Sequence, residues 1–265
     1  MAGKIIASIL SVYQGLKVGF NVDPVKRVVS VDHQHNEYAV TTVEGNPVSK
    51  SFAGIKVISV FARTKARRDR STPGDNCPML YALKGQKDLK TGYRSIVVLY
   101  QNYIRILSNI VEEWRPHGTW DCIIPIPSSS NLPSLMAKSV FSHSGGDVVQ
   151  TKLLSKISAK QVLDSIDELA ISAKDRATLR ARVKNFIREH GGDSAFQIKC
   201  VDTKLRKHLN PFVLMPEPTE APPQRVLLVD DMITSGTSII SAANLLRERY
   251  AGVHIEAITL FGSSR

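Results

Sequence analysis

Residues 226–238 read VLLVDDMITSGTS, and this stretch decides the fold. Its first four residues are apolar, as in a buried strand, and two aspartates follow directly. Small and hydroxyl-bearing residues then lead into residues 237–250, where Ile239, Ala243 and Leu246 recur at helical spacing. The stretch therefore predicts a strand that ends in an acidic tip, turns and enters a helix.

The acidic tip and the turn after it have the chemistry of a site for a phosphorylated sugar. Adjacent carboxylates at Asp230 and Asp231 can accept hydrogen bonds from vicinal ribose hydroxyls, directly or through metal-bound water. Backbone amides at a helix N-terminus bind anions, so a phosphate fits the turn. The residues expected to hold it are Thr234, Ser235, Gly236, Thr237 and Ser238. The alternative is a plain helix cap, for which one acidic residue would suffice.

The surrounding sequence predicts a mixed α/β fold. Residues 225–229 and 253–261 are buried-type strands on either side of the helix, and such a βαβ unit has parallel strands. Ligands of parallel sheets bind beyond the carboxyl ends of the strands. An amphipathic stripe predicts a helix over residues 93–114, and residues 121–127 read as a short strand. A polar loop follows this strand at Ser128, Ser129, Ser130 and Asn131.

The chain is expected to comprise two parts. Residues 1–75 contain β-rich pieces and turn residues, which predict a small antiparallel unit and a basic linker that begins at Arg63. Residues 76–265 are assigned to the α/β domain, which carries a helical insert at about residues 160–192. The proline-rich residues 216–223 predict a connection without regular structure.

Composition limits the class of protein. The formal net charge of +11 favours phosphate-bearing ligands and leaves a nucleic-acid partner open. The three cysteines are scattered, so we expect neither a disulfide framework nor a zinc site, and a reducing cytoplasm fits best. No run approaches the roughly 20 apolar residues of a membrane span, so we expect no membrane partner.

Residues 226–238 resemble the phosphoribosyl-pyrophosphate motif of the type I phosphoribosyltransferase family. Weaker similarity over residues 81–265 points to the competence-protein ComF-like branch. It lies in Tyr81-Ala-Leu-Lys84, the Asp-x-Ile-x-Pro-x-Pro strand at 121–127, Leu153-Leu154 with Lys156 and Gln161, and Arg182-x-x-Asn185. The four-cysteine zinc element usual in that branch is absent, and its Arg-Gly-Phe-Asn run is replaced by NLPSLMA at residues 131–137.

The resemblance implies a parallel sheet flanked by helices and a transferase that binds 5-phosphoribosyl-1-pyrophosphate (PRPP) with Mg²⁺. Asp230 and Asp231 would be the catalytic acids that hold the ribose, and the loop at residues 128–131 would bind the pyrophosphate. Lys156 and Lys160 would supply cations from a flexible loop. A nitrogen acceptor would displace pyrophosphate from the ribose C1 carbon. The magnesium ion would be bound mainly through PRPP, and no metal site formed by the protein alone is expected.

Two other functions fit the same residues. One is a regulator that binds PRPP or a nucleotide as a signal and contacts nucleic acid through its basic surface. The other is a toxin or defence enzyme that consumes PRPP or a nucleotide. The acceptor, the pathway and the choice between a monomer and a homodimer stay open at this point.

Overall fold

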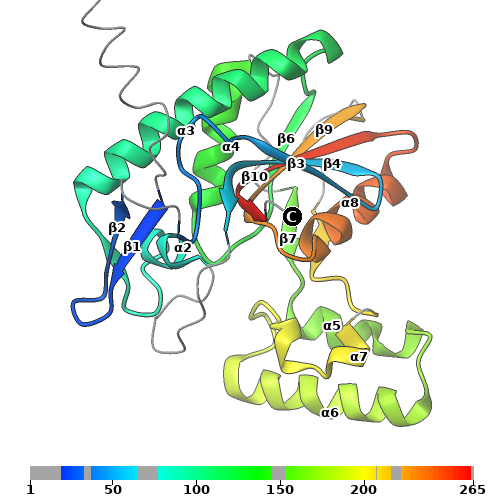
Figure 1. Ribbon diagram of the computed structural model, residues 1–265. Coiled ribbons are helices and arrows are strands. Elements are labelled where there is room, and N and C mark those ends of the chain that lie inside the picture. The colour runs from blue at the N-terminus through cyan, green and yellow to red at the C-terminus, as the bar shows by residue number, and fades with distance from the viewer. Residues whose placement is uncertain are drawn as a thin grey trace, which may run out of the picture.

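The structure is a computed structural model that describes residues 19–32, 37–64, 77–144, 153–206, 208–215 and 222–263. It shows a mixed α/β protein in which helices flank a largely parallel sheet (Figure 1). Most of the predicted basic linker after Arg63 and most of the proline-rich segment lie outside the described residues.

The central sheet has five strands, and four of them run parallel. In sheet order they are β3 (Val48–Phe52), β4 (Ile55–Arg63), β10 (His254–Ser263), β9 (Arg225–Met232) and β6 (Cys122–Pro125). Only β3, at one edge, pairs antiparallel with its neighbour. Strand β6 and residues 226–229 of β9 are continuous apolar runs, as expected for a parallel sheet that is covered on both faces.

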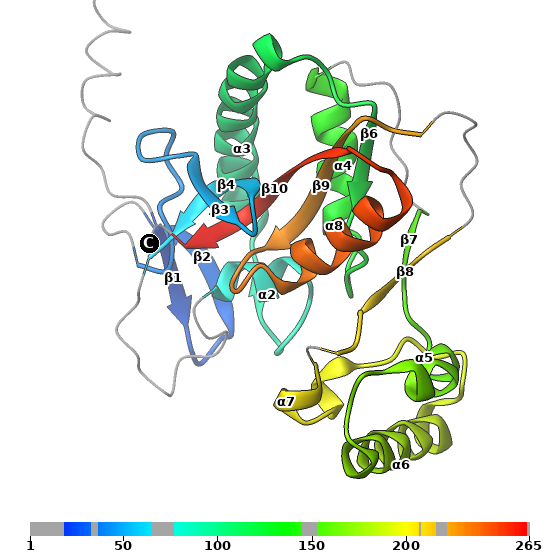
Figure 2. The ribbon, with the colours of Figure 1, turned by 90° about the vertical axis from the view of Figure 1, so that its right-hand side faces the viewer.

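Helices cover both faces of this sheet. The long helix α3 (Tyr93–Trp114) and α4 (Leu132–Ser144) pack on one face, and α8 (Thr237–Arg249) packs on the other (Figure 2). The bounds of α3 confirm the helix predicted from the apolar stripe. Among the described residues, no helix combines the length and the apolar character that crossing a membrane requires.

Strand β9 directs alternate side chains to the two faces, and this alternation positions the acidic pair. Leu227 and Val229 join the core beneath α3 and α4, whereas Leu228 joins the core beneath α8. Because side chains alternate along a strand, Asp231 continues the α3/α4 face and Asp230 continues the α8 face. The two carboxylates therefore leave one strand end into different surroundings.

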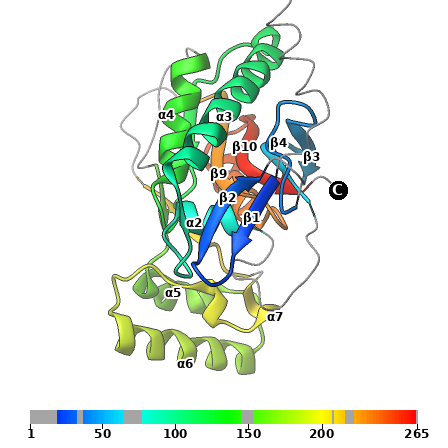
Figure 3. The ribbon, with the colours of Figure 1, turned by 60° about the vertical axis from the view of Figure 1, so that its left-hand side comes forward.

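The N-terminal residues that the structure describes do not form a unit apart from the central sheet. A small sheet contains β1 (Gly19–Asp23), β2 (Val28–Asp32) and β5 (Lys90–Thr91), and it packs beside the short helix α2 (Pro78–Leu83) (Figure 3). However, β3 and β4 belong to the central sheet, so the division expected at residue 75 is corrected. The reason is that the nearly continuous apolar run of β4 is buried on both faces only when it pairs with β10.

A helical insert extends away from the central sheet and lies below the sheet in the view of Figure 1. A two-stranded ribbon of β7 (Leu154–Lys156) and β8 (Phe212–Leu214) carries α5 (Ala159–Ser165), α6 (Ala173–His190) and α7 (Thr203–Arg206). A hydrophobic core of its own holds the insert together. The described residues also form three short 3-10 helices: η1 (Arg115–His117), η2 (Ile166–Glu168) and η3 (Ile198–Cys200).

Side-chain capping explains where the helices of the insert begin. The Ser158 and Gln161 side chains form a reciprocal capping box at the start of α5, and Ser172 accepts a hydrogen bond from the Asp175 amide at the start of α6. Gly191 ends α6 with a positive φ of 88°. The insert therefore extends beyond the predicted residues 160–192, because α7 and η3 add to its core.

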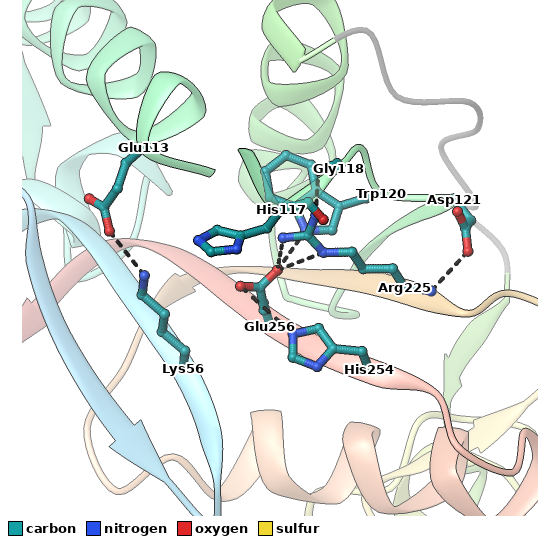
Figure 4. A network of polar contacts seen from close by, with 9 residues as sticks. All are labelled: Lys56, Glu113, His117, Gly118, Trp120, Asp121, Arg225, His254 and Glu256. Carbon is teal, nitrogen blue, oxygen red and sulfur yellow. Dashed lines mark hydrogen bonds and ion pairs between the residues drawn. The ribbon is translucent and has the colours of Figure 1, made fainter. Parts of the chain in front are cut away.

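A buried ion pair joins the sheet to the connection between α3 and β6 at the amino ends of the parallel strands (Figure 4). The Glu256 carboxylate accepts hydrogen bonds from Arg225 Nη2 at 2.7 Å and from Trp120 Nε1 at 3.1 Å. Arg225 also donates to the carbonyl oxygens of His117 and Gly118. The Arg225 guanidinium and the Trp120 indole are thus engaged by Glu256 or by backbone carbonyls, so we assign this network to stability.

Candidate functional site

The Asp231 carboxylate is fixed by contacts from two other parts of the chain. Lys84, just after α2, places its Nζ atom 2.6 Å from Asp231 Oδ2. Ser128, just after β6, donates its hydroxyl to the same oxygen at 2.7 Å. Both side chains of the ion pair are about nine-tenths buried, with exposed fractions of 11% for Lys84 and 8% for Asp231. Three separate segments thus meet at one carboxylate.

Asp230 lies in a different environment. Its Oδ1 atom accepts a hydrogen bond from the Asp231 amide at 2.8 Å, and it forms no ion pair with a described residue. Burial and, to a smaller extent, the neighbouring Asp231 charge raise the pKa of the Asp230 carboxyl to about 7, while the hydrogen bond from the Asp231 amide and the charges of Lys84 and Lys156 oppose the shift. At neutral pH the pair therefore contains one carboxylate neutralised by lysine and one carboxyl that readily gains or loses a proton.

The turn after β9 has an open hydroxyl-bearing surface. Thr234, Ser235, Thr237 and Ser238 are exposed, and a pocket of about 50 Å³ is lined by Asp230 together with residues 232–239. One water-sized probe needs roughly 10–15 Å³, so the pocket accommodates a group of a few heavy atoms, about the size of a phosphate.

Gly236 shapes this turn and begins α8. Its φ of 75° is left-handed, and a Cβ atom there would lie 2.7 Å from Phe52 Cδ1. Gly236 is also the N-cap residue, and no side chain makes a capping hydrogen bond at this helix end. The explanation of the acidic pair as a helix cap is therefore wrong. The amides at the start of α8 have no side-chain cap, as an anion site requires.

The turn is anchored to the neighbouring strands. Arg63, the last residue of β4, donates to the Ile233 carbonyl at 2.9 Å, and the Ile233 amide donates to the Phe261 carbonyl at 2.9 Å. Ser235 and Thr237 hold their hydroxyl oxygens 2.8 Å apart. Arg63 was expected to begin a solvated linker, and this is corrected, because its guanidinium reaches the turn.

The polar loop after β6 lies beside the acidic pair, as the parallel topology predicts. Ser128 contacts Asp231 directly, and the Ser129 hydroxyl accepts a hydrogen bond from Gln86 Nε2 at 3.0 Å. Ser130 is half-buried, and its hydroxyl lies 3.5 Å from the Leu132 amide at the start of α4. Asn131 is exposed, and its carbonyl accepts from the Leu135 amide.

The two lysines expected on a flexible loop both lie on regular elements. Lys156 ends strand β7, and its charge lowers the pKa of Asp230, so it lies within electrostatic reach of the site. Lys160 is exposed on α5 in the insert, where its amide donates to the Gly192 carbonyl at 2.8 Å. The structure thus brings Lys156, but not Lys160, toward the acidic pair.

Sequence reasoning did not assign three side chains that the structure brings to the site: Lys84, Gln86 and Arg63. Lys84 stood in the similarity at residues 81–84 without a role. Its contact with Asp231 joins residues far apart in the chain, and no local pattern reports such a contact. The one signal in the sequence that could have indicated this role was a lysine directly after the short apolar stretch that forms α2.

Two further observations concern the thiol and the metal-ligating side chains near this site. Burial raises the pKa of the Cys77 thiol to about 12, so this nearby cysteine is protonated and is not a nucleophile. In the part of the chain that the structure describes, no group of three or more His, Cys, Asp or Glu side chains could hold a metal ion.

Comparison with known proteins adds no assignment. No family model and no curated protein matches the chain. The site is therefore interpreted from its own geometry.

Proposed function

We propose that this protein is a phosphoribosyltransferase that binds PRPP and Mg²⁺ and transfers the phosphoribosyl group to a nitrogen acceptor with release of pyrophosphate. One observation carries the proposal. Twin aspartates end a central parallel strand, and the chain continues through an uncapped, hydroxyl-bearing turn into a helix N-terminus. Acceptors for sugar hydroxyls and donors for a phosphate thus stand side by side.

The donor would bind through separate contacts for ribose and phosphate. Asp230 and Asp231 would accept hydrogen bonds from the ribose hydroxyls. The amides and hydroxyls of residues 234–238 would hold the 5-phosphate at the positive end of the α8 dipole. This division fits the pocket, whose lining includes both Asp230 and residues 234–238.

The loop at residues 128–131 would receive the pyrophosphate. It follows β6, the strand next to β9, and its Ser128 hydroxyl already contacts Asp231. Lys84 lies beside both groups, with its Nζ atom 3.4 Å from Ser128 Oγ. A cation at this point would stabilise the charge that develops on the departing diphosphate. Lys156 would add a second positive charge from the side of Asp230.

A magnesium ion fits the residues present only as a partner of the ligand. Mg²⁺ is usually bound by one or two carboxylates together with substrate phosphates. Lys84 already neutralises Asp231, whereas Asp230 forms no ion pair with a described residue. Asp230 would therefore be the protein's contact to the ion or to one of its water ligands. The ion would supply charge neutralisation for the pyrophosphate.

Calorimetry with PRPP and Mg²⁺ tests the binding step. We expect saturable heat for the wild-type protein and none for Asp230→Asn combined with Asp231→Asn. The matched control combines Asp193→Asn with Asp202→Asn, which removes two exposed carboxylates of the insert and should leave binding unchanged. No heat for the wild-type protein, or equal heat for both double variants, overturns the proposal.

Pyrophosphate release with a panel of nucleobases and amines tests the transfer step. The transferase predicts release that depends on Mg²⁺ and on one acceptor. Binding of PRPP without pyrophosphate release, with every acceptor and with water, would leave only the regulator. In that event, nucleic-acid binding should fall steeply with salt and change with PRPP.

A further inference from the structure

An apolar pocket of about 410 Å³ lies between α3 and α4 on the Asp231 face of the sheet. Ligand pockets usually span about 300–1,000 Å³, so this one is large enough for a bicyclic ring system. Its walls include Phe61 and Leu260 from the sheet, Leu99 and Tyr103 from α3, and Met136 from α4. Nothing in the proposed binding of PRPP uses this space.

The pocket lies at the end of the sheet where the site is. Its α3 residues belong to the N-terminal half of that helix, and its α4 residues belong to the first turns of α4. Two lining residues, Leu83 and Leu132, directly adjoin Lys84 and the loop at residues 128–131 in the chain. Because Lys84 and Ser128 both contact Asp231, the pocket borders the Asp231 contacts.

One polar group in the pocket wall lacks a partner. The Tyr103 hydroxyl is buried and makes no hydrogen bond with a described residue, and Tyr103 itself is 6% exposed. Burial raises the pKa of the Tyr103 hydroxyl to about 12, and Ser139, which also lines the pocket, lies near enough to oppose this rise, although the two hydroxyls do not reach hydrogen-bond geometry. Buried hydroxyls without partners destabilise a fold by about 1–3 kcal/mol, so each one calls for an explanation.

We infer that this pocket binds the acceptor, and that the acceptor is an aromatic nitrogen heterocycle with a largely apolar ring system. The inference rests on the proposed function. The apolar walls would hold the rings, the Tyr103 or Ser139 hydroxyl would bond one ring nitrogen, and a second nitrogen would face the Asp231 end. A polar pyrimidine would leave its carbonyl and amino groups unpaired against these walls, which disfavours it.

The bond changes balance for such an acceptor. A ring nitrogen donates its lone pair to the ribose C1 carbon, the bond between C1 and the pyrophosphate oxygen breaks, and pyrophosphate leaves with that electron pair. The second ring nitrogen then gives up its proton to water. The products are the ribosylated heterocycle, pyrophosphate and one proton.

Benzimidazole serves as the probe, with cytosine as the polar comparison and indene as a ring of the same shape without nitrogen. We expect calorimetry to show binding of benzimidazole but not of cytosine. Ser139→Leu fills the pocket and should weaken benzimidazole binding at least 10-fold. Ser142→Leu, on the same helix but outside the pocket, should not. Tyr103→Phe should weaken benzimidazole by about 3- to 10-fold, the range of one hydrogen bond, and leave indene unchanged.

PRPP binding is measured on the same proteins, and this separates the two proposals. If PRPP does not bind, the proposed function fails whatever benzimidazole does. The further inference alone fails if PRPP binds and benzimidazole does not, or if Ser139→Leu and Ser142→Leu behave alike. It also fails if bound benzimidazole yields no pyrophosphate from PRPP and Mg²⁺. Pyrophosphate release that Ser139→Leu abolishes, with PRPP binding intact, supports it.

Discussion

Replacing Asp230 with Asn should remove a pH-dependent cost to folding. Burial and the Asp231 charge raise the pKa of Asp230 from 3.8 to about 7, and the side chain is only 9% exposed. One pKa unit corresponds to about 1.4 kcal/mol, so a shift of roughly three units corresponds to a cost on the order of 4 kcal/mol. Asn keeps an oxygen for the Asp231 amide and carries no charge at any pH.

The direction of the pH dependence follows from the number of protons that the folded and unfolded states bind. Below about pH 4 the carboxyl is protonated in both the folded and the unfolded state. Between about pH 4 and pH 7 the folded state keeps a proton that the unfolded state loses, so stability falls as pH rises. Above about pH 7 the carboxyl is ionised in both states, and stability falls no further. Asp230→Asn should therefore match the wild type near pH 4 and exceed it at pH 8 by up to about 4 kcal/mol.

Urea denaturation at several pH values between 4 and 8 measures this difference. Asp193→Asn, an exposed change of the same chemistry, is the control and should follow the wild type at every pH. A difference between Asp230→Asn and the wild type that does not change with pH would refute the reasoning, and so would a less stable variant at pH 8. Because PRPP with Mg²⁺ should favour the ionised carboxylate, its affinity for the wild type should rise between pH 6 and pH 8.

Three further predictions concern other parts of the structure. Lys84→Met should lower the free energy of unfolding by about 3–5 kcal/mol at pH 7, and adding Asp231→Asn should recover part of that loss. If urea denaturation shows that the losses of the two single variants add in the double variant, the buried ion pair is contradicted. Gly236→Ala should destabilise the fold by about 1–3 kcal/mol and weaken PRPP binding, because the new Cβ atom clashes with Phe52. Adding Phe52→Leu should relieve part of that clash, and an unchanged melting temperature for Gly236→Ala alone would contradict the prediction. Glu256→Leu should cost about 3–5 kcal/mol and leave the PRPP dissociation constant unchanged, whereas an altered constant would connect this network to the site.

The elements that sequence could predict are those with local signals. The helix at residues 93–114 follows from the spacing of its apolar residues, and the strand, turn and helix at residues 225–249 follow from the local order of apolar, acidic and small residues. Neighbouring parallel strands place their carboxyl ends at one edge of the sheet, and the loop that follows β6 therefore reaches Asp231 through Ser128. The assignment of this loop to pyrophosphate stays a prediction.

The rest depends on pairings that local patterns do not report. The pairing of β4 with β10 brings together residues some 200 positions apart in the chain, such as Ser59 and Thr259, which form a hydrogen bond. Lys84 reaches Asp231 only because α2 packs against the same face of the sheet. Arg63 seemed part of a basic linker because its neighbours in the chain are charged, although its guanidinium bonds the turn at Ile233.

The two aspartates at the end of β9 have different hydrogen-bond and ion-pair partners, and this difference is the strongest support for a ligand. Lys84 and Ser128 stabilise the buried charge of Asp231, whereas among the described residues Asp230 accepts a hydrogen bond only from the next backbone amide. Neither carboxylate caps α8, because Gly236 occupies that position without a side-chain bond. An apolar residue at position 230 would stabilise the fold more, since burying an unpaired carboxyl is unfavourable. A carboxyl that lowers stability and lines an open pocket supports the proposal that a partner arrives from solution, such as a ribose hydroxyl or a hydrated magnesium ion.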